Sequence, residues 1–167
     1  MAKKYYTVTV TPALSASAYS NADVLFTSTE IKLPASGCKL LNVQAIWNDT
    51  QAPSEEILLF FFQNNTAELG TLLGAPSITA AQIATNVFLG ARRIVNSSSH
   101  EADLGTPSLL TANPTGDAGA QAAGPYEPIV LKSGATKDVV YVQGLLETTG
   151  GITCAVDSLK IVLHLEV

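Results

Sequence analysis

Hydrophobic and polar residues alternate with a period of two along most of the chain, which is the pattern of half-buried β-strands. The first such segment places Tyr6, Val8 and Val10 on one face and threonines on the other, and Pro12 ends it. Residues 159–167 alternate in the same way at the other end of the sequence. Strand-like segments also lie between these two, at residues 24–33, 38–47, 57–62, 89–95, 129–131 and 138–147.

Two of these segments indicate how the strands are buried. Residues 38–47 have one apolar and one polar face, as expected of a sheet with one wet side. The apolar face is formed by Leu41, Val43, Ala45 and Trp47. Residues 57–62, with the sequence Ile-Leu-Leu-Phe-Phe-Phe, are apolar on both faces. This second pattern indicates either a central strand buried in the core or a strand whose outer face contacts another subunit.

A short helix is predicted where the alternation stops, within residues 77–88. Ser77 or Thr79 can cap its first turn. The helix would carry one mixed apolar face, made of Ile78, Ala81, Ile83 and Val87.

About eight short strands and one short helix predict an all-β, mainly antiparallel fold. We expect a jelly-roll-like β-sandwich that forms a single domain over residues 1–167, a length that suits one core. Residues 96–128 depart from the pattern, because small and polar residues dominate there and no period is sustained. A stretch of this length is either a disordered loop or an extended arm that orders against neighbouring subunits. Its low charge favours the arm.

Charged residues make up only 14% of the chain, well below the usual ~25%. Such a surface belongs either to a small neutral monomer or to a protein that other subunits cover. The second reading is favoured, because free monomers keep a more charged surface. The net charge of -5 argues against nucleic acid as a partner. No apolar run approaches the ~20 residues of a membrane helix, and the N-terminus does not resemble a signal peptide.

The residues that could carry chemistry are few and scattered. Ser97, His100 and Asp103 are the residue types of a hydrolase triad, but triad members come from separate elements that the fold brings together. No phosphate-binding loop or dinucleotide fingerprint is present. Cys38 and Cys154 are the only cysteines, and buried free thiols are favoured over a disulfide between them. We expect neither an enzyme nor a bound cofactor or metal.

Several segments together resemble a group of small structural proteins of tailed bacteriophages. They are the start Tyr5-Tyr-Thr-Val-Thr-Val-Thr-Pro12, the passage Ala22-Asp-Val-Leu25 that leads to a strand over 40–47, Ile57-Leu-Leu-Phe-Phe-Phe62 followed by Gln-Asn-Asn-Thr66, Thr79-Ala-Ala-Gln-Ile83, and Asp157-Ser-Leu-Lys-Ile-Val-Leu163. The resemblance covers most of the chain apart from residues 96–128. It implies a virion structural protein, assembled in the host cytoplasm, that decorates or cements a capsid or has another role on the virion surface.

A cement protein would bridge capsomers of the major capsid protein, and we expect a homo-oligomer, with a trimer favoured by the symmetry of a shell. The expected contacts are the apolar strand and the 96–128 stretch, with Leu58, Phe60, Phe62, Leu109, Leu110 and Tyr126 as the candidate residues. Two alternatives stay open. One is a tail or baseplate module that binds carbohydrate or a receptor through the exposed aromatic residues Tyr5, Tyr6, Tyr19 and Tyr126. The other is a major shell protein built from a single jelly roll.

Overall fold

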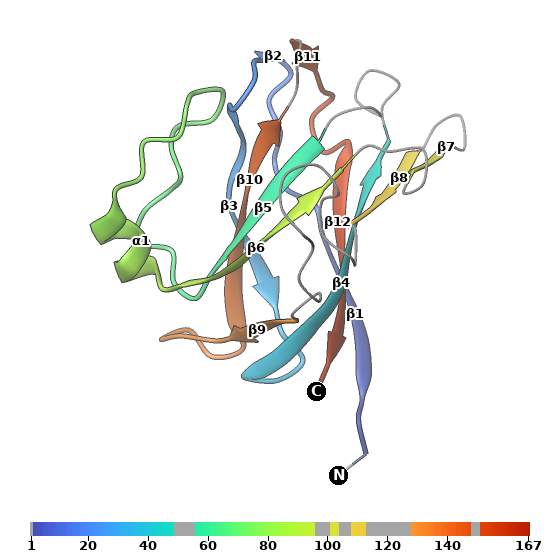
Figure 1. Ribbon diagram of the computed structural model, residues 1–167, viewed down its shortest axis with the longest axis vertical. Helices are drawn as coiled ribbons and strands as arrows, with labels where there is room; N and C mark the ends of the chain where they lie inside the picture. Colours follow the sequence, from blue (N-terminus) through green and yellow to red (C-terminus); the bar gives the residue numbers. More distant parts are fainter. Residues whose placement is uncertain (1, 49–55, 96–100, 104–107, 113–127, 148–150) are drawn as a thin grey trace, which may run out of the picture.

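Two antiparallel sheets pack face to face in the computed structural model, which describes residues 2–48, 56–95, 101–103, 108–112, 128–147 and 151–167 (Figure 1). The larger sheet contains, in spatial order, β1 (Tyr5–Val10), β12 (Leu159–Glu166), β4 (Gly37–Trp47), β8 (Ser108–Thr111) and β7 (Glu101–Asp103), and β9 (Ile129–Lys132) also pairs with β4. The smaller sheet contains β3 (Val24–Lys32), β10 (Val139–Glu147), β5 (Glu56–Phe62) and β6 (Phe88–Ile94). A separate pair is formed by β2 (Ala18–Tyr19) and β11 (Ile152–Thr153).

The strand order is that of a jelly roll. Among the eight principal strands, the first in the chain pairs with the last (β1 with β12), the second with the seventh (β3 with β10), the third with the sixth (β4 with β8) and the fourth with the fifth (β5 with β6). These nested pairs are distributed over two sheets, as in a double Greek key. The predicted all-β, jelly-roll-like sandwich is confirmed.

The core lies between the two sheets and is built by the alternation seen in the sequence. In β5, Ile57, Leu59 and Phe61 point into it and are fully buried, while the residues between them face outward. In β12, Ile161 and Leu163 contribute to the same cluster from the opposite sheet. A buried large side chain contributes roughly 1.5–3 kcal/mol, so this interleaved layer is the main source of stability.

One predicted face is corrected in β4. Leu41 is exposed and Leu40 is buried, although the alternation assigned the core face to Leu41. The cause is a register shift against β12, where Asn42 lies opposite His164 and Leu40 lies opposite Leu165. One extra residue in a strand reverses the facing of all residues beyond it. The predicted inward positions Val43, Ala45 and Trp47 lie on the other side of the bulge and are buried.

The predicted helix is α1 (Ala80–Asn86), which lies beside the smaller sheet (Figure 1). Thr79 is its N-cap, and its hydroxyl accepts from the Gln82 backbone N–H in a capping box. The predicted apolar face is only partly correct. Ile83 packs against apolar side chains of the sheet, whereas Val87 is the C-cap in a left-handed conformation and is exposed.

The stretch 96–128, which shows no period in the sequence, contains two short strands, β7 and β8. β8 pairs with β4 and places Leu110 in the core. Removal of the whole stretch would therefore remove part of a sheet. Residues 113–127 lie outside the described residues. The two cysteines are buried and are not joined by a disulfide, as favoured from the sequence.

Candidate functional site

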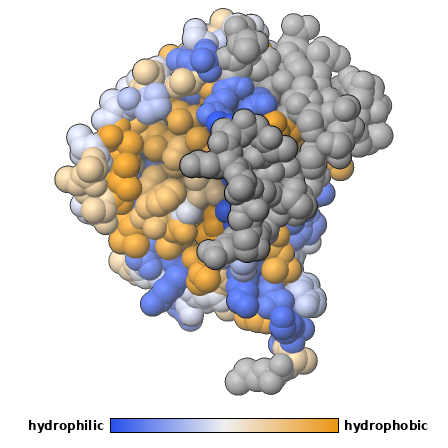
Figure 2. Space-filling view, viewed as in Figure 1, coloured by the Kyte–Doolittle hydropathy of each residue, from blue (hydrophilic) through white to orange (hydrophobic). Residues whose placement is uncertain are grey.

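The outward face of the smaller sheet carries an apolar hollow of about 250 Å³. Its floor consists of outward side chains of β5, β6 and β10, and its wall comes from the segment 63–87 and α1. The lining residues are Phe60, Phe62, Leu69, Pro76, Ile78, Ile83, Phe88 and Leu145. We call this set the apolar hollow. Figure 2 shows hydrophobic residues gathered on one face of the molecule, beside the region of α1.

The aromatic residues of the hollow pack on one another and leave Phe88 the most exposed of the three. The Phe88 ring centroid lies 5.7 Å from that of Phe62 and 6.3 Å from that of Phe60. Both distances are in the range of favourable tilted aromatic pairs. Phe62 is only 1% exposed, but Phe88 is 45% exposed. The rim of the hollow thus presents a large apolar ring to any molecule that approaches.

The wall of the hollow is held in place by a buried amide. Asn86, at the end of α1, is fully buried and its side chain bonds only to backbone and hydroxyl groups of the loop opposite. Its Oδ1 accepts from the Thr66 N–H (2.9 Å), the Thr66 hydroxyl (2.6 Å) and the Ala67 N–H (3.1 Å), and its Nδ2 donates to the Ala67 carbonyl (2.6 Å). Four bonds from one side chain fix the path of the loop.

A second buried amide ties the same loop to the sheet. Gln143 of β10 accepts from the Leu69 backbone N–H at 2.6 Å and donates to the Ala67 carbonyl at 3.3 Å. Buried amides are retained only when they are paired in this way. The hollow is therefore a preformed feature of the fold, because the loop in its wall is anchored to both α1 and β10 before any partner arrives.

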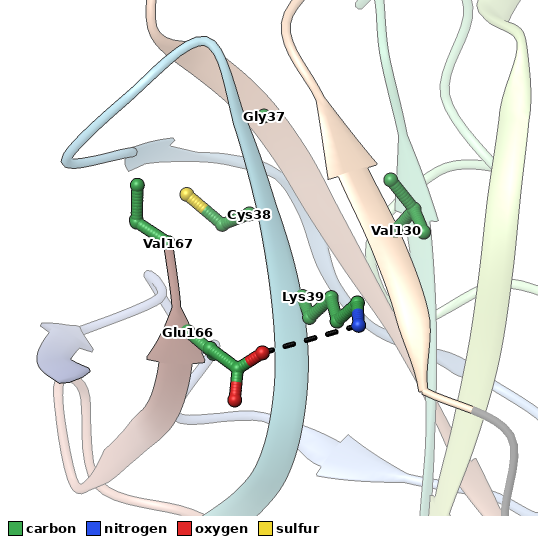
Figure 3. A pocket seen from close by; sticks show the side chains of 6 residues that line it. All are labelled: Gly37, Cys38, Lys39, Val130, Glu166 and Val167. Atoms are coloured by element: carbon green, nitrogen blue, oxygen red, sulfur yellow. Dashed lines mark ion pairs between the residues drawn. The ribbon is translucent and has the colours of Figure 1, made fainter. Parts of the chain in front are cut away.

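A second, more open hollow of about 260 Å³ lies where β4, β9 and β12 meet (Figure 3). It is lined by Gly37, Cys38, Lys39, Val130, Glu166 and Val167. Lys39 Nζ lies 3.9 Å from Glu166 Oε1, so the two charges neutralise each other at the surface. Burial raises the pKa of the Cys38 thiol, which makes it a poor nucleophile at neutral pH. This hollow offers no catalytic arrangement.

Other polar side chains in the described ranges are also dispersed. His164 lies on the polar face of β12, with its Nε2 3.2 Å from Gln44 Oε1. Within the same ranges, no three His, Cys, Asp or Glu side chains are grouped as metal ligands would be. Nor is any described helix long and apolar enough to span a bilayer.

No protein-family model matches the chain, and no curated protein matches its sequence. Chains of several solved virus structures align with this chain at low TM-scores. A chain of Desmodium yellow mottle tymovirus is 13% identical with a TM-score of 0.28, over 100% of this chain and 88% of that one. A chain of turnip yellow mosaic virus is 8% identical with a TM-score of 0.28, over 100% of this chain and 94% of the virus chain. A chain of the infectious bursal disease virus VP2 subviral particle is 11% identical with a TM-score of 0.30, over 98% of this chain and 40% of the VP2 chain. The jelly-roll order itself rests on the strand pairing of this chain alone.

The contact residues expected from the sequence fall into three groups. Leu58, Phe60 and Leu109 are partly exposed, and Phe60 lines the apolar hollow. Phe62 and Leu110 are buried within the chain itself, so their contacts are already made. Tyr126 lies outside the described residues.

Sequence reasoning missed Phe88, the most exposed aromatic residue of the hollow. Phe88 lies just before the predicted strand 89–95 and carries no periodic signal, and only the register of β6 against β5 places it beside Phe62. Of the tyrosines considered for sugar stacking, Tyr19 is fully buried, with its hydroxyl donating to the Leu25 carbonyl. Tyr5 and Tyr6 are exposed on β1, far along the sequence from the hollow, and no stacking platform is formed among the described residues.

Proposed function

We propose that the protein is a virion structural protein, and more specifically a decoration or cement subunit that bridges capsomers of the major capsid protein of a phage head. The observation that carries the proposal is the preformed apolar hollow with Phe88 on its rim. An exposed apolar patch of this kind marks a site where a protein partner binds. The low share of charged residues, 14%, points in the same direction.

The energy available per site is modest, which suits a protein that acts in many copies. Complete burial of a phenylalanine side chain contributes about 2 kcal/mol, so covering the exposed part of Phe88 contributes about 1 kcal/mol. Further apolar contact around the hollow adds to this. A shell multiplies such a gain by the number of equivalent sites, and a trimer on local threefold axes would use each subunit in the same way.

The jelly roll is a fold of shell subunits but also of lectins and cupins, so it does not by itself decide the function. The apolar character of the hollow favours contact with protein over contact with sugar. A sugar site would need polar groups to satisfy the hydroxyls of its ligand, and the lining of the hollow consists of apolar side chains.

The test uses purified protein and empty heads assembled from the major capsid protein of the same genome. We expect the protein to co-sediment with the heads and to raise the temperature at which they disassemble. Phe88→Asp should abolish both effects, because it places a charge on the rim of the hollow. The matched control is Val130→Asp, which puts the same charge on an apolar residue that is 57% exposed on the other sheet and should leave binding intact.

Two outcomes would overturn the proposal. Binding to a glycan array without binding to heads would identify a carbohydrate module. Closed particles formed by the purified protein alone would identify a major shell protein.

A further inference from the structure

The strand β1 forms one edge of the larger sheet and pairs with β12 only, among the strands that the structure describes. Lys4 and Val167 exchange two backbone hydrogen bonds, at 3.1 and 2.9 Å, just outside the ladder. Hydrogen-bonded and non-hydrogen-bonded pairs alternate along an antiparallel ladder. The register then directs the backbone groups of Tyr6, Val8 and Val10 toward β12.

The same alternation directs the N–H and C=O groups of Tyr5, Thr7 and Thr9 away from the sheet. No hydrogen bond within the described part of the chain uses these groups. The side chains agree with an open edge, because all three residues are exposed. β1 therefore presents three N–H donors and three C=O acceptors, spaced as a neighbouring strand would need them for pairing.

The corresponding edge of the smaller sheet, β3, is partly covered by the chain itself. The Val24 N–H donates to the Gly74 carbonyl at 2.9 Å, and the Val24 carbonyl accepts from the Leu73 N–H at 3.1 Å. Farther along β3, the Ser28 N–H donates to the Glu68 carboxylate at 2.7 Å. The fold thus covers part of the β3 edge and leaves the β1 edge available.

Natural sheets protect open edges with proline, charge or bulges. β1 has none of these between Tyr5 and Val10, where the sequence is Tyr-Tyr-Thr-Val-Thr-Val and the register against β12 is unbroken. All six residues have high β propensity. Such a strand is suited to accept another strand by edge-to-edge addition.

We propose that β1 pairs antiparallel with β1 of a second copy of this chain, about a twofold axis at Thr7. In this register Thr7 faces Thr7 of the partner subunit. Tyr5 faces Thr9 of the partner subunit, and Thr9 faces Tyr5 of the partner subunit. Each of these pairs exchanges two hydrogen bonds, so every outward group of the three residues is satisfied. A shift by two residues in either direction would leave Tyr5 or Thr9 without a partner.

The side chains are self-complementary in the same register. Tyr6 lies opposite Val8 of the partner subunit on the other face, an aromatic and β-branched pair of the kind that stabilises sheets. The basic residues do not meet, because Lys3 falls opposite Thr11 and Lys4 opposite Val10. The Lys3 ion pair with Glu166, at 3.1 Å, can persist. Isologous twofold contacts require this kind of self-complementarity.

A cysteine cross-link tests the register in the full-length protein. Thr7→Cys should form a disulfide-linked dimer under mild oxidation, because paired Cα atoms at a hydrogen-bonded site are about 5.5 Å apart and within disulfide reach. Thr9→Cys is the matched control on the same face of the same strand. Its Cα should lie roughly 14 Å from the equivalent atom of the partner subunit, since four residues separate them along the strand. Equal or faster cross-linking of Thr9→Cys would overturn the proposal.

A proline substitution tests the hydrogen bonds. Thr7→Pro removes an N–H that β12 does not use, and proline is tolerated at such edge positions. We expect sedimentation to show that the unmodified protein has twice the mass of Thr7→Pro, while Thr7→Val keeps the full mass. In the unmodified protein, the amides of Thr7 and Thr9 should exchange more slowly at high protein concentration. Unchanged mass in Thr7→Pro, or concentration-independent exchange, would refute the pairing.

The pairing is independent of the proposed role on a shell. Phe88→Asp addresses the apolar hollow and Thr7→Pro addresses the edge, which lies on the other sheet. A variant that no longer dimerises but still binds heads, or one that dimerises but no longer binds heads, shows that the two proposals are independent.

Discussion

Gly144 in β10 occupies a position where the structure leaves no room for a side chain. It lies at a register shift, opposite Phe26 of β3 and Leu59 of β5. A Cβ atom there would lie 2.7 Å from Cζ and 2.8 Å from Cδ1 of Phe26, and closer still to Cε1. Carbon atoms in contact prefer 3.5–4.0 Å. Gly144→Ala therefore forces the fully buried Phe26 ring out of its place in the core.

The expected loss of stability is about 2–3 kcal/mol, the upper part of the range for overpacking a well-packed core. For a domain of this size that corresponds to a decrease of roughly 5–10 °C in Tm. Urea unfolding followed by the fluorescence of Trp47, the only tryptophan and a fully buried one, measures the change. Gly37→Ala is the control, because nothing lies within 4 Å of the added atom, and its midpoint should not move.

A double variant tests the stated cause. Gly144→Ala combined with Phe26→Leu should be more stable than the sum of the two single changes implies, because the smaller side chain relieves the overlap. An unfolding midpoint of Gly144→Ala within error of that of Gly37→Ala would refute the reasoning. Strict additivity in the double variant would show that Phe26 is not the obstacle.

Three further changes are expected to have measurable effects. Asn86→Ala should lower stability by about 3 kcal/mol, since it leaves buried donors of Thr66 and Ala67 without an acceptor, and it should speed amide exchange at both residues. Val87→Gly should raise Tm, because a β-branched residue in the left-handed region costs about 1–2 kcal/mol and glycine does not. Burial raises the pKa of Cys38 above its usual 9.0, so the folded state holds this proton more tightly than the unfolded state. Stability should then fall as the pH rises above about 9, as urea midpoints over a pH series would show.

Each of these expectations has a contradicting result. Unchanged exchange at Thr66 and Ala67 would mean that Asn86 does not hold the loop. A lower Tm for Val87→Gly would mean that the side chain contributes more than the backbone strain removes. A stability that stays constant above pH 9 in the unmodified protein, or a decline that persists unaltered in Cys38→Ala, would exclude the thiol as the cause.

The sequence was sufficient for the fold because strand periodicity and helix capping are local signals. The alternation in β12 and the spacing of Thr79 and Gln82 each predict their element without knowledge of any neighbour. Leu40 and Leu41 lie on the faces opposite to those predicted, because Leu41 is the extra residue of a bulge. That bulge is set by pairing with β12, a strand more than a hundred residues away. No local pattern contains that information.

The candidate site was less predictable for a related reason. The apolar strand β5 was recognised, but its outward face became a hollow only through the loop that Asn86 and Gln143 hold over it. Phe88 entered the site through the register of β6 against β5. Asn86 lies in the predicted helix and Gln143 in a predicted strand, and neither pattern indicates that these amides anchor a loop.

The nested pairing of strands also governs when the fold can form during synthesis. The innermost pair, β5 with β6, joins strands that are close in the chain, whereas Tyr5 meets Glu166. Non-local pairing of this kind makes folding slow, because loop closure must precede the contacts that reward it. β1 leaves the ribosome well before β12, the strand with which it pairs. Until β12 has emerged, the alternating threonines and valines of β1 lack this neighbour, so the nascent chain is most prone to aggregate through β1 in that interval.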